Sequence, residues 1–352
     1  MNAPTAFQRM PWLGSWYEAL AERPDVSALV ITVRDGATGE VALVLPLVLR
    51  IVGRLRVIEF ADLNLTDYNA PLLGPAAPRD GAAMRRLWRA VRRALPAADV
   101  LRLSKLEPRL SGRPNPLALM RGAVPCALAG NTLDIRQDLH SRQGSVLSRE
   151  ERKHIARTWR IFTKEPGAGF ERITEIARGK DVLAALERLQ AGRMNALGAQ
   201  YVLNEPRHAL FYRLLIERGI ADGSVVLTAL TAGDEIVAVH LGLRHEERCI
   251  TIRVGMAGGR WASCSPGRLV IAQTMAALQT EGVRVFDLGI GDYTYKRRLG
   301  CKPLPLLDVV QPLSWRGLAP AARALLVGHL RTRPGLNRRL RSWLCRFDAF
   351  KF

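Results

Sequence analysis

The sequence predicts an α/β (α+β) protein of two domains, and three observations lead to this expectation. At 352 residues the chain is longer than one typical domain. Strand-like runs alternate with helix-like runs in both halves of the sequence. Hydrophobic residues make up 48% of the chain and charged residues 24%, a balance that allows two sizeable cores.

The first half opens with strand signals and continues with a helix. The runs 27–33 and 41–52 are rich in Val, Ile and Leu and flank the turn Asp35-Gly36-Ala37-Thr38-Gly39, which predicts a hairpin. A short strand is expected at 55–60 and another at 100–103. Apolar residues at helical spacing predict a helix over 82–95 between them. The Pro- and Gly-containing stretch 107–130 is interpreted as a long connection.

A basic helix is expected between the two halves. Ser148 and Glu151 have the spacing of a capping box that opens a helix through Arg160. Its charged residues include Arg149, Arg152, Lys153, Arg157 and Arg160. A solvated helix face is the simpler interpretation of this pattern, and binding of a polyanion is the alternative.

The second half repeats the alternation more clearly. We expect strands over 168–173, 225–231, 235–243, 249–254 and 283–288, and helices over 180–195, 206–219 and 268–279. A Gly-rich loop, 255–267, precedes the last of these helices. The resulting domain boundaries are 1–140, a basic linker helix at 141–165, a second domain at 166–313 and a basic amphipathic tail at 314–352.

The formal net charge of +20 is the most unusual property of the chain. It favours a polyanionic partner, which can be nucleic acid, an acidic membrane surface or a phosphorylated ligand. A general enrichment in arginine, unrelated to function, would give the same balance. The tail 314–352 combines basic with apolar and aromatic residues. It is interpreted as packing on the body or as contacting an anionic membrane or a synthase complex.

Cysteine usage and the termini point to a reducing compartment. The five cysteines are scattered and show no CxxC spacing, which argues against disulfides and against a metal site. No signal-peptide pattern opens the chain. The longest apolar run, 41–52, is too short to span a bilayer. We therefore expect a cytoplasmic protein without metal, in some circumstances peripheral at the inner membrane.

The start of the helix after residue 265 is a candidate anion site. Ser265, Pro266 and Gly267 supply a cap residue, a first-turn proline and a glycine. Free backbone N–H groups and the positive end of the helix dipole favour an anion there, and Arg268 adds a formal charge. Helix starts of this kind also occur for structural reasons alone. No GxxxxGK[ST] sequence follows, which argues against a nucleotide-hydrolysing loop.

A second polar cluster follows the last strand. The run FDLGIGDYTYK, 286–296, ends a strand in glycines and releases Asp287, Asp292, Tyr293, Tyr295 and Lys296 into a turn. These side chains could supply a base, a phenolic acid and a cation at the carboxyl end of a strand. A structural Asp–Lys pair beside a tyrosine is the competing interpretation.

The sequence resembles the CelD-like branch of the GNAT acetyltransferase superfamily, which is associated with cellulose and exopolysaccharide biosynthesis. The resemblance is carried by Arg193, by the SPGRL run at 265–269 and by the FDLGIGDYTYK run at 286–296. The resemblance covers about 20–313. It departs from the usual pattern at 190–192, Gln-Ala-Gly, where a histidine often precedes the helical arginine. Leu288 replaces a usual aromatic residue.

The resemblance implies tandem GNAT-like domains, each a mixed, mostly antiparallel sheet flanked by helices, with a degenerate first domain. It implies that Ser265, Pro266, Gly267, Arg268 and Leu269 hold the pyrophosphate of acetyl-CoA or another acyl-CoA. Direct attack on the thioester needs a base, an oxyanion site and an acid for the thiolate.

We expect Tyr295 to be the acid, with Tyr293 as the second choice. Asp287 or Asp292 would serve as base or acceptor anchor, with Lys296 as their charge partner. Arg193 is expected to contact the acceptor. His240 is assigned to the acceptor cleft or, alternatively, to the packed interior of its strand. Cys264 has no histidine near it in sequence and is not expected to be a nucleophile.

Three functions remain open on this evidence. The first is acyl transfer to an amine or hydroxyl of a sugar or surface-polymer precursor. The second is a Fem-type transfer that uses aminoacyl-tRNA, for which the positive charge is suited. The third is a non-catalytic scaffold of an exopolysaccharide synthase.

Overall fold

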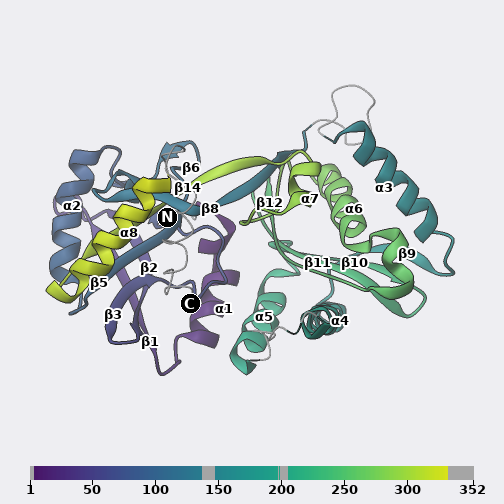
Figure 1. The fold of residues 1–352 in the computed structure, drawn as a ribbon. Helices are drawn as coiled ribbons and strands as arrows, with labels where there is room; N and C mark the ends of the chain where they lie inside the picture. The colour runs from purple at the N-terminus through teal and green to yellow at the C-terminus, as the bar shows by residue number, and fades with distance from the viewer. Residues whose placement is uncertain (1–3, 137–146, 197, 199–204, 332–352) are drawn as a thin grey trace. The chain divides into compact units, whose positions relative to one another are not determined.

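The computed structural model describes residues 4–136, 147–196, 198 and 205–331, and it divides into two compact units (Figure 1). Of the described residues, unit 1 contains 4–9, 16–129 and 304–331, and unit 2 contains those within 10–15 and 130–303. The basic helix and the tail are thus placed differently from the expected boundaries. Residues 149–162 lie within unit 2, and 314–331 lie within unit 1.

Unit 1 is a mixed sheet with a helix on each face. Its strands are β1 (Val26–Arg34), β2 (Val41–Val52), β3 (Leu55–Phe60), β5 (Val100–Leu106) and β14 (Lys302–Pro312), in that order across the sheet. Only β3 and β5 are parallel. Short β4 (Leu72–Leu73) pairs with β2, and β6 (Arg109–Leu110) with β7 (Arg113–Pro114). The hairpin of β1 and β2 confirms the one predicted from 27–52.

Side chains along the strands of unit 1 point alternately to the two faces of the sheet, and each face packs against a different helix. Ile58, Leu101 and Val309 pack with Met84 and Trp88 of α2 (Gly81–Ala94). Their neighbours in sequence point the other way. Val57, Val100 and Val310 accordingly pack with Ala321 of α8 (Leu318–Arg331), which follows η5 (Trp315–Gly317).

The strands of unit 2 also form mixed sheet, in the order β8, β13, β12, β11, β10, β9. The bounds are β8 (Ala123–Asp134), β9 (Ala168–Ile173), β10 (Val225–Ala232), β11 (Glu235–His245), β12 (Arg248–Met256) and β13 (Val285–Asp287). Neighbouring strands in this order are antiparallel, except β12 and β13, which are parallel.

Helices cover this sheet with apolar side chains. On one face lie α6 (Pro266–Thr280) and α3 (Arg149–Phe162), whose Val270, Met275 and Phe162 share a core with Val237 and Phe286. The other helices are α4 (Ile176–Ala196), α5 (Pro206–Gly219), α7 (Thr294–Arg298) and 3₁₀-helical η4 (Gly259–Cys264). Short η1 (Ala6–Gln8), α1 (Met10–Leu20) and η2 (Pro116–Leu119) belong to the first part of the chain.

The basic helix begins as the sequence predicts, and its burial explains its position. Ser148 accepts a hydrogen bond from the Glu151 N–H at 3.1 Å, as expected for the cap. Ile155, Thr158 and Phe162 recur on one side of α3 and are buried. The helix is therefore part of the unit 2 core and presents only its opposite side to solvent.

Both units follow the same plan. In unit 1 the parallel strands β3 and β5 are joined through α2, and antiparallel β14 follows at β5. In unit 2 the parallel strands β12 and β13 are joined through α6, and antiparallel β8 follows at β13. The mixed, mostly antiparallel strands flanked by helices confirm the predicted fold class. No helix among the described residues is long and apolar enough to cross a membrane.

Candidate functional site

Two parallel strands of unit 2 separate after a short stretch of pairing. Residues 248–250 of β12 pair with residues 285–287 of β13. β12 then continues to Met256, while the chain leaves β13 at Leu288. In α/β sheets, ligands bind beyond the carboxyl ends of parallel strands, where helices begin. The second half of β12, the end of β13 and the start of α6 therefore define the candidate site.

β12 carries a bulge where the two strands separate. Its register with β11 places Arg253 opposite Leu241 and Thr251 opposite Gly242. Ile252 consequently has no partner in that ladder. A bulge leaves one residue unpaired and bends its strand, and bulges are frequent beside active sites.

The start of α6 has the expected cap residue in an unexpected conformation. Ser265 occupies the cap position with φ 48° and ψ 56°, in the left-handed region, and its side chain makes no capping hydrogen bond. Its carbonyl accepts the Arg268 and Leu269 N–H groups at 3.0 and 3.1 Å. Pro266 has no N–H. Among the described residues no hydrogen bond uses the Gly267 N–H, so this group and the helix dipole remain for an anion.

Arg268 is bound to the protein itself. Its guanidinium donates to both carboxylate oxygens of Glu151 on α3. Glu151 is only 5% exposed. The ion pair attaches α3 to the start of α6 and balances much of the charge that the sequence assigned to an anion site. The Arg268 Nε is buried without a hydrogen-bond partner. Burial, followed by the charge of Arg268, lowers the pKa of nearby His154.

The chain after β13 forms a turn held by buried side chains. Asp287 is fully buried, accepts from Arg248 at 2.5 Å and accepts the Gly289 N–H at 2.6 Å. Lys296, 2% exposed, donates to the carbonyls of Gly289 and Ile290 at 3.1 and 2.7 Å.

Asn131 of β8 binds the same turn from the other side. Its amide donates to the carbonyls of Gly289 and Gly291, both at 2.9 Å. Gly289 and Gly291 have φ of 71° and 98°, which only glycine adopts without strain.

Each of the two aspartates has an arginine partner. Asp287 pairs with Arg248, and Asp292, 76% exposed, pairs with Arg297 at 2.7 Å. Lys296 serves the backbone of the turn. Asp287 and Lys296 thus hold the chain that leads into α7, while Asp292 lies at the surface.

The two tyrosines lie together beyond this turn. Their rings are 6.1 Å apart between centroids and stacked, with Tyr293 exposed and Tyr295 half-buried. Burial raises the pKa of Tyr295 to about 12, and Tyr293 and Cys301 act in the same direction. The charge of Arg193 on α4 partly opposes this rise. The structure therefore brings Arg193, which is exposed, into electrostatic range of Tyr295.

Helix α4 approaches the second half of β12 closely. A Cβ added at Gly255 would lie 2.7 Å from Leu186 Cδ1, so glycine permits this approach. Gln190 donates to the Val254 carbonyl at 3.0 Å and accepts from Arg253 at 2.7 Å. Gln190 lies where the family resemblance leads one to expect a histidine, and no sequence pattern marks Arg253 or Asn131.

His240 lies in the interior. It is fully buried, its Nε2 lies 3.0 Å from Thr251 Oγ1, and burial lowers its pKa to about 3. Its ring packs against Phe286 at 5.7 Å. Of the two interpretations of His240, the geometry is that of the packed strand histidine. Burial also raises the pKa of the Cys249 and Cys301 thiols to about 12.

The corresponding place in unit 1 is filled by the chain itself. β3 and β5 pair over residues 57–59 and 100–102, and Asn69 then bridges to Leu106. Lys105 binds Asp62 at 2.6 Å, and Asn69 donates to Asp62 at 3.0 Å. Lys105 and Asn69 are buried. These contacts attach the segment that follows β3 to the end of β5. No group of three or more metal-binding side chains is found in the described ranges.

Comparison with known proteins places this geometry in a recognised class. Residues 149–297 match the family model described as acetyltransferase (GNAT) domain, which covers α3 to α7 and includes the separating strands. The chain thus contains a GNAT acetyltransferase domain, which confirms the general part of the predicted resemblance. The CelD-like branch remains a prediction. No curated protein matches the chain in sequence.

Solved structures share the fold at low sequence identity. FemX covers 85% of this chain and 96% of its own, with 10% identity and a TM-score of 0.57. The C-terminal domain (DUF2156) of a putative lysylphosphatidylglycerol synthetase from Agrobacterium fabrum is also similar. The match covers 95% of this chain and 94% of that domain, with 14% identity and a TM-score of 0.53. For L-PGS from Bacillus licheniformis, the match covers 89% of this chain and 94% of the other chain, with 11% identity and a TM-score of 0.53. At these identities the likeness concerns the fold alone.

Proposed function

We propose that this protein is an acyltransferase whose acyl-CoA donor lies between β12 and β13, with its pyrophosphate at the start of α6. The acceptor is an amine or hydroxyl of a sugar or surface-polymer precursor. The observation that carries this proposal is the separation of the parallel strands after three paired residues, directly beside a helix start. The GNAT domain match over the same residues supports it.

The donor site is built mainly from backbone. Gly267 contributes its N–H, and Ser265 to Leu269 present the positive end of a 15-residue helix. Arg268 supports the site by attaching α3 and adds only part of its charge. The unpaired backbone at Ile252 in the bulge is the candidate oxyanion donor.

The chemistry is assigned to the tyrosine pair. The acceptor attacks the thioester carbonyl, a C–N or C–O bond forms and the C–S bond breaks. Tyr295 gives its proton to the leaving sulfur and regains one from solvent. Its raised pKa keeps it protonated at neutral pH. Asp292 takes the acceptor proton or anchors the acceptor, and Arg193 contacts it.

Three residues change role in this proposal. Asp287 and Lys296 become positioning residues, since they bind Arg248 and the carbonyls of the turn that carries Tyr293. His240 takes no part because it is fully buried. We do not expect a second donor in unit 1, since the buried ion pair of Asp62 and Lys105 lies beside the end of β5, the strand that corresponds to β13. We therefore infer that the first domain is degenerate and that one chain binds one acyl-CoA.

Isothermal titration with acetyl-CoA and longer acyl-CoAs tests the donor site. In Gly267→Glu the added Cβ would lie 2.6 Å from Met256, and a carboxylate would stand at the helix start. Gly258→Glu is the matched control, because nothing lies within 4 Å of a Cβ there. We expect saturable binding at one site per chain, lost in Gly267→Glu and kept in Gly258→Glu. Absence of binding by the folded protein would overturn the proposal.

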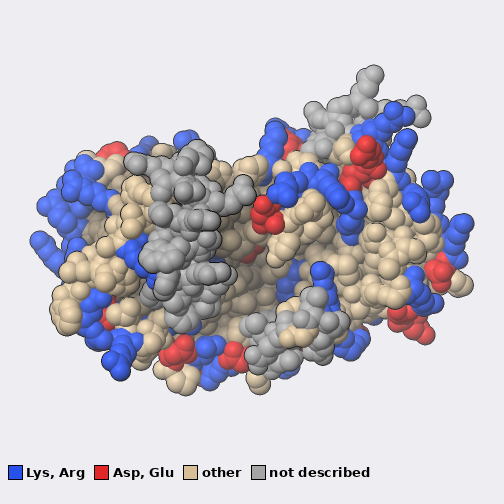
Figure 2. All heavy atoms as spheres, viewed as in Figure 1, with Lys and Arg blue, Asp and Glu red and all other residues tan. Residues whose placement is uncertain are grey.

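A Fem-type transfer from aminoacyl-tRNA is the second candidate. It is favoured by basic side chains over α2 and over α3 (Figure 2). The exposed ones are Arg85, Arg86, Arg89, Arg92 and Arg93 on α2, and Arg149, Lys153, Arg157 and Arg160 on α3. Affinity for tRNA that falls steeply with salt and requires the aminoacyl group would favour this candidate over acyl-CoA.

We also propose peripheral contact with an anionic membrane through η5 and α8. Trp315, Leu318 and Leu326 are 81%, 58% and 56% exposed, and helical spacing puts Leu318 and Leu326 on one side. Exposed Arg316 lies beside them. Apolar and basic groups in this arrangement suit the interface of an anionic bilayer. Residues 332–352 of the expected tail lie outside the described residues.

A further inference from the structure

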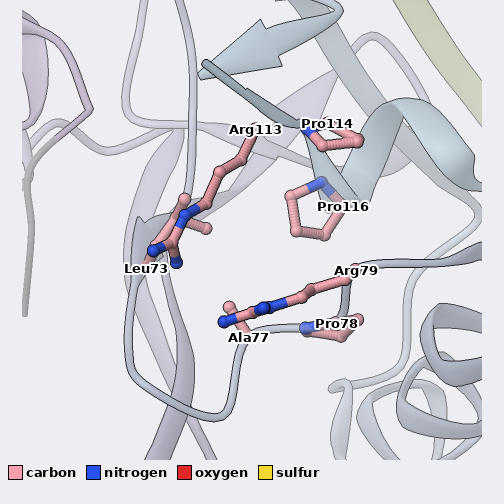
Figure 3. Close-up of a pocket in the computed structure, with 7 residues that line it drawn as sticks. All are labelled: Leu73, Ala77, Pro78, Arg79, Arg113, Pro114 and Pro116. Carbon is pink, nitrogen blue, oxygen red and sulfur yellow. The ribbon is translucent and has the colours of Figure 1, made fainter. Parts of the chain in front are cut away.

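A hollow in unit 1 has two arginines at its walls (Figure 3). Arg79 stands just before α2, and Arg113 belongs to β7. Pro78, Pro114 and Pro116 line the hollow with their rings. In Figure 3 the two guanidinium groups extend toward the same side of the hollow.

The charges of this hollow are not balanced by the protein. No carboxylate lines it. Among the described residues, neither Arg79 nor Arg113 forms an ion pair or a hydrogen bond through its guanidinium. The nearest acid in sequence, Asp80, accepts the N–H groups of Ala82 and Ala83 at 2.8 Å and caps α2. Both arginines are exposed, so their guanidinium groups are open to a ligand, and an anion bound between them would be attracted by both charges.

The walls of the hollow are fixed before any ligand binds. Asn115, fully buried, donates to the Glu107 carbonyl at 2.8 Å and accepts the Leu117 N–H at 3.0 Å. On the other wall, a Cβ at Gly74 would lie 1.8 Å from the Val41 carbonyl oxygen, so this segment lies directly on β2. A site held in this way loses little entropy when a ligand binds.

We propose that this hollow binds the phosphate group of a phosphomonoester. A phosphate dianion matches two guanidinium groups in charge and accepts paired hydrogen bonds from each. The proline rings offer an apolar surface to the remainder of the ligand. The site is separate from the donor site of unit 2 and does not depend on the proposed acyl transfer.

Titration of the full chain with inorganic phosphate, phenyl phosphate and benzoate tests the site and its ligand class. We expect phenyl phosphate to bind saturably and more tightly than benzoate, because the dianion engages both arginines. Arg79→Gln and Arg113→Gln should each weaken phenyl phosphate binding about tenfold, and the double variant should abolish it. Arg89→Gln, an exposed arginine of α2 outside the hollow, should change the affinity less than twofold.

Two further arms separate the alternatives. Vesicles with phosphatidic acid, compared with soluble phenyl phosphate, distinguish a lipid source from a soluble one, and loss of either binding in the double variant supports the site. Gly267→Glu should leave phenyl phosphate binding unchanged, which separates this site from the acyl-CoA site. Unchanged binding in the folded double variant, equal affinity for benzoate, or no saturable binding of any probe would overturn the proposal.

Discussion

The ion pair between Glu151 and Arg268 gives the sharpest prediction on stability. Glu151→Gln keeps the shape of the side chain and removes its charge, so the guanidinium of Arg268 loses its counter-charge inside unit 2. Breaking a buried pair on one side costs about 3–5 kcal/mol. The Arg268 side chain is 23% exposed, so solvent recovers part of this. We therefore expect a loss of about 2–3 kcal/mol in the free energy of unfolding.

Urea unfolding followed by tryptophan fluorescence measures this loss, with Arg268→Gln and the double variant completing the cycle. Because the double variant leaves no unpaired charge, it should be more stable than the sum of the single losses predicts, by about 1–2 kcal/mol. The variant Glu150→Gln, exposed on the same helix, should change stability by less than about 0.5 kcal/mol. Additive losses in the cycle would show that the two side chains are not coupled, and the reasoning would fail.

The remaining predictions concern catalysis, pH, the turn and the membrane. Tyr295→Phe should lower kcat about 10²–10⁴-fold with unchanged acyl-CoA affinity, whereas an unchanged kcat would refute its role as acid. Since the pKa of Tyr295 is about 12, the wild-type rate should lose no acid group between pH 8 and 10. The pKa of His240 is lowered to about 3, so its contribution to stability is present above pH 6.5 and is lost as pH falls toward 3. His240→Gln should flatten the fall in stability between pH 6.5 and 4, and an equal slope would contradict this. Asn131→Ala removes the donor of the Gly291 carbonyl and one of the two donors of the Gly289 carbonyl, and should cost about 1–3 kcal/mol and lower kcat, while melting temperature and turnover both unchanged would exclude its positioning role. Trp315→Ser with Leu326→Ser should reduce flotation with anionic vesicles, whereas Val30→Ser, equally exposed on β1, should not.

Much of the fold could be predicted because its signals are local. The hairpin before residue 52, the helix near 82–95 and the capped helix at 149 follow from apolar periodicity and turn residues within a few positions. The candidate site was predictable in part for the same reason. The SPGRL run does begin a helix, and the FDLGIGDYTYK run does follow a strand that ends beside it.

The partners of the site residues could not be predicted, because they come from distant positions. Asn131 reaches the turn at Gly289 across 158 residues, and Glu151 reaches Arg268 across 117. Nothing in either short sequence marks these contacts. The arginine partners of the two aspartates lie outside the short run for the same reason. Sequence proximity points to Lys296 as their charge partner, whereas Arg248 of the neighbouring strand binds Asp287 and Arg297 of α7 binds Asp292.

Each unit includes a strand from the other part of the sequence, and this affects both the synthesis of the protein and its division into fragments. β13 is bordered by β8, which is synthesised well before it, and β5 is bordered by β14, which is synthesised last. A fragment that starts at residue 166 would expose the edge of β13, and one that ends at residue 140 would expose the edge of β5. Unit 1 therefore completes the pairing of β5 only after β14 has left the ribosome. Neither half is suited to separate expression, and a split protein should regain its structure only when the two fragments are folded together.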